Sequence, residues 1–124
     1  MAPKSKEYLN YIGGKWISAK SGKTFHNINP ADQDEIIGLF PDSGTDDVDA
    51  AVQIAERAFQ EWRLVPPPKR GEIILEAGLL LKERKEELAR LMTKEMGKVL
   101  RETRGDVQEA IDMALYMAGE GRRL

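Results

Sequence analysis

The sequence offers few side chains with which to perform chemistry. It contains no cysteine and a single histidine, His26. The missing thiols exclude a disulfide, a thiolate metal site and a cysteine nucleophile within these 124 residues. A single histidine also excludes an HExxH motif and a histidine-rich metal cluster. His26 lies in a predicted strand, and the sequence places no serine or cysteine partner beside it, so we predict a structural or surface role.

One short run, Ser21-Gly22-Lys23-Thr24, matches the end of a phosphate-binding P-loop. A P-loop also needs a glycine at position 17, where this chain has Ile17, because its backbone must curl around phosphate. Residues 25–30 read FHNINP and cannot open the helix whose N-terminus would face the anion. A G-x-G-x-x-G dinucleotide fingerprint is absent as well. We therefore predict no cofactor-binding residue here, and no tight cofactor binding by this chain alone.

Three acidic residues lie in helical patterns, namely Glu95, Glu109 and Asp112. Glu95 follows the apolar positions of a long helical stretch, and the other two lie in the last helical pattern. From spacing alone, such carboxylates are typical of a solvated helix flank or a cap. The residues by themselves therefore identify no catalytic group.

Composition excludes several classes of partner. The formal net charge is −2, and the charged residues, 32% of the chain, are of mixed sign. No basic surplus indicates nucleic acid, and no acidic tail indicates a disordered binder. No apolar run is long enough to span a membrane, and the N-terminus lacks the apolar core of a signal peptide. These features predict a cytoplasmic protein with neither nucleic acid nor membrane as a partner.

The first third of the chain reads as strands. Aromatic and β-branched runs flank Gly13-Gly14, which predicts a β-hairpin with a primed turn. A turn at residues 21–23 leads into a strand at 24–28, and Asn29-Pro30 provides a second turn. The apolar run 35–40 then predicts a short buried strand.

From Thr45, a predicted N-cap, the period changes to that of helices. The first apolar stripe is followed by three prolines, which end that helix and supply Pro68 as the first residue of the next. Residues 69–100 form the longest helical stretch, with Gly97 as its left-handed C-cap. Residues 82–87 include no apolar side chain, so one long helix and two shorter helices both remain compatible with this stretch. A last helix ends at residues 119–121. The first stripe comprises Val48, Ala51, Val52, Ala55, Phe59 and Trp62, and the last comprises Val107, Ala110, Ile111, Ala114, Leu115 and Ala118. Together the strands and helices present more apolar faces than 124 residues can bury.

Several segments together resemble the N-terminal part of NAD(P)-dependent aldehyde dehydrogenases. Each segment is common by itself, but their order and spacing from Tyr8 to Leu124 make the resemblance specific. The segments are Tyr11-Ile12-Gly13-Gly14-Lys15-Trp16, Ile28-Asn29-Pro30-Ala31, Glu35-Ile36-Ile37, Asp47 to Val52 with Ala58, Phe59 and Trp62, Arg70 to Leu81, Glu87 to Ala89, Glu95-Met96-Gly97-Lys98, and Tyr116 to Gly119.

The resemblance implies an α/β fold class. This chain alone would show antiparallel β-hairpins at 8–41, followed by a cluster of amphipathic helices at 45–124. Residues 8–124 would form the N-terminal portion of a coenzyme-binding domain, preceded by a mobile arm at residues 1–7. In the complete enzyme the helices would pack on a parallel sheet, with the hairpins along its edge.

The resemblance also implies an activity. Enzymes of this family oxidise an aldehyde through a cysteine thiohemiacetal and pass hydride to NAD or NADP. Their cysteine, their general-base glutamate and their coenzyme glycines come later in the family's sequence than these 124 residues. We therefore expect this polypeptide alone to be inactive, with no catalytic residue in it.

For specific residues, the resemblance implies two sites and several partners. Asn27, Ile28 and Glu95 are similar to a place where family members hold a structural monovalent cation, for which oxygen ligands are suitable. Glu109 is similar to a residue on the helix that borders the aldehyde entry tunnel, where it would orient a polar substrate. The resemblance also implies that the full-length enzyme is a homo-oligomer that acts on an aldehyde. The alternative is a non-catalytic truncated product, or an interaction module that binds a protein through its exposed apolar helix faces.

Overall fold

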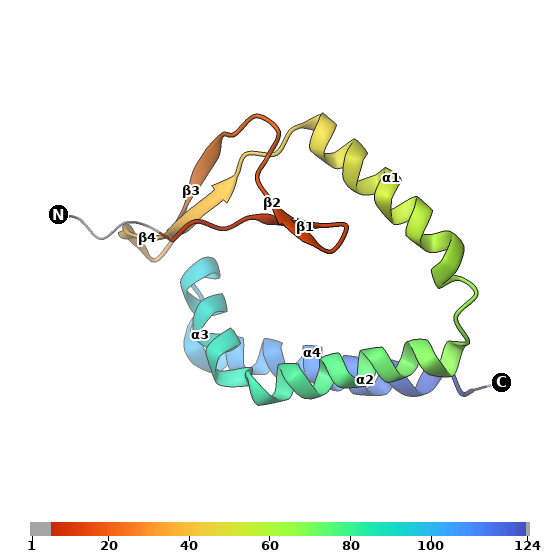
Figure 1. Cartoon of the computed structure of the whole chain (residues 1–124). Coiled ribbons are helices and arrows are strands. Elements are labelled where there is room, and N and C mark those ends of the chain that lie inside the picture. The colour runs from red at the N-terminus through yellow and green to blue at the C-terminus, as the bar shows by residue number, and fades with distance from the viewer. Residues whose placement is uncertain (1–5, 124) are drawn as a thin grey trace. The chain divides into compact units, whose positions relative to one another are not determined.

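The computed structural model describes residues 6–123, which form four strands followed by four helices (Figure 1). The predicted order of hairpins and then helices is therefore confirmed. The chain divides into two compact units, residues 1–63 and residues 64–124. Over the described range, no helix combines the length and apolarity that crossing a membrane requires.

The first hairpin joins β1 (Asn10–Ile12) to β2 (Lys15–Ile17). Tyr11 lies opposite Trp16 in the ladder, with ring centroids 4.9 Å apart. The two turn residues have positive φ angles, 61° at Gly13 and 76° at Gly14. A primed two-residue turn needs this left-handed backbone at both positions, which glycine adopts without steric cost. The hairpin predicted from the Gly-Gly pair is confirmed.

The second hairpin joins β3 (Thr24–Asn29) to β4 (Asp32–Pro41). Its register is regular from Thr24 to Asn27 and then shifts on both sides of Ile28, which marks a bulge. The strand predicted at residues 35–40 is present, but its predicted burial is wrong, because Ile36 is 45% exposed. Within this unit no second layer covers that side chain.

Residues next to the N-terminus lie along β4. The Tyr8 amide donates to the Leu39 carbonyl over 2.8 Å, and the Leu39 amide donates to the Lys6 carbonyl over 2.9 Å. The Tyr8 ring stacks on Phe40 with centroids 4.5 Å apart and covers Gly38, where an added Cβ would come within 2.5 Å of that ring. Of the arm predicted at residues 1–7, residues 1–5 lie outside the described range, and residues 6 and 7 form this contact.

Helix α1 (Thr45–Trp62) begins after Gly44, so the N-cap predicted at Thr45 is wrong. Asp47 provides the cap from within the first turn, because its carboxylate accepts the Gly44 amide hydrogen over 2.9 Å. Its other oxygen accepts the amide hydrogen of Lys20, also over 2.9 Å, and so ties the helix to the loop before β3. These two backbone hydrogen bonds, with Gly44 the stronger cause, lower the pKa of Asp47.

The apolar stripe of α1 is uncovered in the first unit. Val48, Val52 and Phe59 are 56%, 59% and 54% exposed, and Trp62 is 41% exposed. The helix forms at the predicted place, but most of its apolar face stays exposed within residues 6–63. Helix formation here follows from local pattern and capping rather than from burial.

The second unit holds α2 (Pro67–Glu83), α3 (Lys85–Met96) and α4 (Leu100–Glu120). The charged run at residues 82–87 contains a break at Arg84, with φ −96° and ψ 14°, so the two-helix alternative is the one adopted. Gly97 ends α3 with φ 70°, as predicted, and its amide donates to the Thr93 carbonyl over 2.9 Å. Helix α2 begins at Pro67, one residue before the predicted start.

Helices α2 and α4 lie antiparallel and very close together (Figure 1). A Cβ at Gly71 would lie 2.4 Å from the Ala118 carbonyl oxygen, and one at Gly121 would lie 2.4 Å from the Pro67 carbonyl oxygen. About two turns after Gly71 in α2, a Cβ at Gly78 would lie 3.1 Å from the Ala114 side chain. At Gly71 and Gly121 only a residue without a Cβ permits this approach, because the backbone atoms that a Cβ would meet cannot rotate aside.

The core of the second unit lies between α3 and α4. Its buried centre consists of Ala89, Val107 and Ile111, all at most 3% exposed. Half-buried apolar side chains surround it, namely Leu81, Leu88, Met92, Leu100 and Leu115. Polar pairs add to this contact: the hydroxyls of Thr93 and Thr103 lie 2.8 Å apart, and Arg104 donates twice to the Glu86 carboxylate. The core is small, and many large apolar side chains remain exposed, as the sequence predicted.

We expect Gly71→Ala to destabilise the second unit by about 1–3 kcal/mol, since the new Cβ would force α2 and α4 apart. The control is Gly105→Ala in α4, where nothing lies within 4 Å of the added Cβ. That change should stabilise the unit by up to about 1 kcal/mol through helix propensity. Urea unfolding of the full chain, followed by circular dichroism, measures both. Equal stability of the two variants would contradict the close contact.

The Asp47 cap predicts a pH dependence of stability. Folding lowers the pKa of this carboxyl, so its contribution is complete above its ordinary value of 3.8 and is lost as pH falls toward the lower folded value. Asp47→Asn should therefore cost most near neutral pH and progressively less from about pH 5 downward. Unfolding free energies of wild type and variant across this range measure the difference. Asp49→Asn, an exposed position of the same helix, is the control, and a pH-independent cost of Asp47→Asn would refute the prediction.

Candidate functional site

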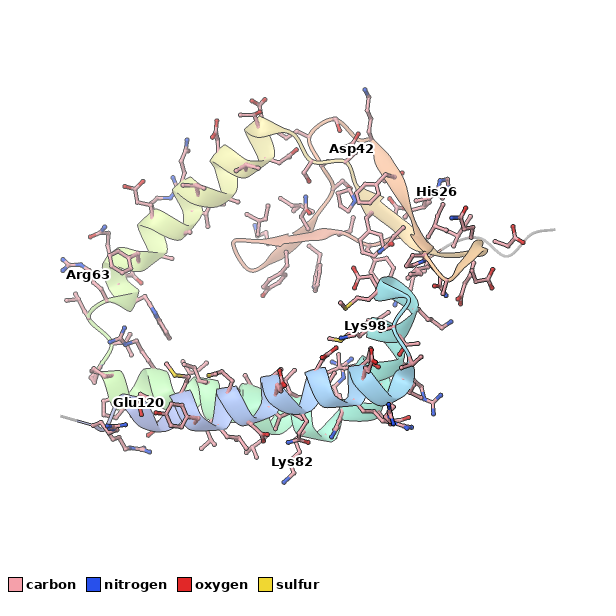
Figure 2. The ribbon with its side chains drawn as sticks, turned by 180° about the vertical axis from the view of Figure 1, so that it is seen from behind. His26, Asp42, Arg63, Lys82, Lys98 and Glu120 are labelled. Carbon is pink, nitrogen blue, oxygen red and sulfur yellow. The ribbon has the colours of Figure 1, made fainter. Side chains whose placement is uncertain are left out.

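The two residue groups that first suggested chemistry are structural in this fold. Gly22 forms a turn with φ 66°, and the chain enters strand β3 at Thr24 instead of a helix. The loop thus leads into a strand and opens no helix of its own, so the P-loop interpretation is excluded. His26 lies exposed on β3 opposite Leu39 and is labelled in Figure 2. Its exposure agrees with the surface alternative of the predicted structural or surface role.

Helix α4 carries an acidic face near its start. Glu102, Asp106 and Glu109 follow one another at steps of four and three, which places them on one side of the helix. Lys98, labelled in Figure 2, lies just before this helix and brings its ammonium to this face. The Lys98 Nζ and the Asp106 Oδ2 are 2.5 Å apart, and both side chains are about one-third exposed.

The electrostatics of this face centre on Lys98. Its pKa is raised, chiefly by the hydrogen bond to Asp106, while partial burial acts in the opposite direction. The charges of Asp106, Glu102 and Glu109 raise the pKa of Lys98 further. The Lys98 ammonium therefore interacts with three carboxylates of this face.

Glu109, the residue assigned to a substrate tunnel by resemblance, is exposed on α4. Asp112 follows one turn later and is engaged elsewhere, because it accepts a hydrogen bond from Gln108 over 2.8 Å. Gln108 in turn accepts a hydrogen bond from Lys85 of α3 over 2.7 Å. Asp112 thus belongs to a polar link between α3 and α4. The role of Glu109 at a substrate tunnel stays a prediction.

Sequence reasoning missed the pairing of Lys98 with Asp106. These residues are eight apart, and Lys98 lies before Val99, the N-cap of α4, so no helical spacing relates them. The ion pair joins the loop before α4 to the second turn of that helix. The only available signal was the opposite charge of the two side chains, which is too common to be specific.

The residues predicted to bind a cation fall in different units. Asn27 and Ile28 lie on β3 in the first unit, at the register shift where the ladder is irregular. Glu95 lies exposed near the end of α3 in the second unit. Among residues 6–123, no three His, Cys, Asp or Glu side chains gather as a metal site. The cation site, which relies on backbone carbonyls and one carboxylate, stays a prediction.

The candidate site consists of charged groups on the surface of α4. Its charged face offers hydrogen-bond acceptors to a polar group and a single ammonium to an anion. A nucleophile paired with a base is absent from it, and the sequence contains no thiol.

Comparison with known proteins identifies the family. The family model described as the aldehyde dehydrogenase family matches residues 16–124. The chain belongs to this family. The α/β fold class expected from the resemblance is thereby confirmed, together with the hairpins and helices that represent it in this chain.

Individual relatives support the same family assignment. The chain is 41% identical to an alpha-ketoglutarate semialdehyde dehydrogenase of Haloferax volcanii and 44% identical to malonate-semialdehyde dehydrogenase 2 of Geobacillus thermodenitrificans. Each match covers 93% of this chain and 24% of the relative. The solved NAD-dependent aldehyde dehydrogenase of Sinorhizobium meliloti matches with a TM-score of 0.91 at 31% identity, over 97% of this chain and 24% of that one. The chain thus spans about a quarter of the length of these aldehyde dehydrogenases.

Proposed function

We propose that this chain is the N-terminal segment of an enzyme that oxidises an aldehyde to a carboxylic acid, with NAD or NADP as hydride acceptor. The observation that carries the proposal is the match of nearly the whole chain to about a quarter of several aldehyde dehydrogenases. The chain has no cysteine and cannot itself supply the thiol that the resemblance implies for the reaction. Its part is to form the first portion of the coenzyme-binding domain and one wall of the substrate tunnel.

The substrate we propose is a small aldehyde with a polar far end. Matched relatives bear the names of semialdehyde dehydrogenases, which supports this class. Glu109 is an acceptor of hydrogen bonds, so it would attract a substrate amine or hydroxyl and repel a carboxylate. Lys98 offsets part of this repulsion, although Asp106 already holds it. We also infer from the resemblance that the whole enzyme is a cytoplasmic homo-oligomer.

The alternative is an interaction module that binds a protein partner through apolar helix faces. The uncovered stripe of α1, with Val48, Val52 and Phe59 all more than half exposed, is the observation that favours it. Under this alternative the dehydrogenase relationship is ancestry without activity. The two functions predict gene products of different length: a full-length dehydrogenase for the enzyme, and the short chain alone for the interaction module.

The first test is the intact mass of the gene product purified from its natural source, together with its aldehyde-dependent reduction of NAD and NADP. We expect a mass several times 13.9 kDa and aldehyde-dependent activity. A product of 13.9 kDa without activity would overturn the enzyme proposal and favour the interaction module.

The role of Glu109 can be tested in a chimera in which this chain replaces the matched segment of the Haloferax volcanii relative. Glu109→Ala should raise KM roughly tenfold for an amino aldehyde, because a charge-assisted hydrogen bond is lost. For a carboxylate-bearing semialdehyde KM should fall, since repulsion is removed, and for a plain aliphatic aldehyde it should not change. Glu76→Ala, an exposed glutamate of α2, is the control. An unchanged KM for all three aldehydes would exclude the role.

The cation site formed by Asn27, Ile28 and Glu95 can be tested in the same chimera. Its melting temperature should be higher in potassium chloride than in tetramethylammonium chloride of equal ionic strength, because only the smaller ion fits among oxygen ligands. Glu95→Gln should remove this difference by weakening the site, whereas Glu76→Gln should leave it intact. Equal melting temperatures in the two salts for the unmodified chimera would rule the site out.

A further inference from the structure

We draw no further inference here: the strongest candidate, the apolar groove where α2, α3 and α4 meet around Leu81, Leu88 and Met92, carries none because nothing in the described residues shows what covers it.

Discussion

The approach of Gly71 in α2 to the carbonyl of Ala118 in α4 is the constraint on which the second unit depends. Contact between helix backbones without intervening side chains leaves α4 free to present its other side to α3, where Val107 and Ile111 form the buried centre with Ala89. Because α4 serves both partners, a change in its distance from α2 would also shift its packing against α3. A small core depends strongly on such fixed geometry, since it has few contacts in reserve.

Features set by local sterics were predictable from the sequence. Gly13-Gly14 and Gly97 mark places where only a residue without a Cβ adopts the backbone comfortably, and each forms the predicted turn or cap. Features set by distant parts of the chain were not. The cap at Asp47 involves the backbone of Lys20, and the exposure of Ile36 depends on whether another layer lies over it. The type of a residue indicates which backbone conformation and environment it favours, whereas its burial depends on which other segments of the chain pack over it.

The candidate site likewise has features that the sequence predicted and features that it did not. The absence of a thiol nucleophile followed directly from composition, because a chain without cysteine cannot form a thioester. The family followed from the order of several weak segments, none specific by itself. The acidic face of α4 was visible only in part, since Glu109 came from resemblance, while Lys98 lies outside the helix that carries Asp106 and shares no helical spacing with it. Their pairing could be found only from the fold.

The placement of the two tryptophans has a consequence for spectroscopy. Trp16 and Trp62 are the only tryptophans in the sequence, and both lie in the first unit. Intrinsic fluorescence therefore reports on that unit and leaves the second unit nearly silent. Far-ultraviolet ellipticity is weighted the other way, because three of the four helices, α2, α3 and α4, belong to the second unit. The two signals together distinguish a chain whose halves melt as one from a chain whose halves melt separately.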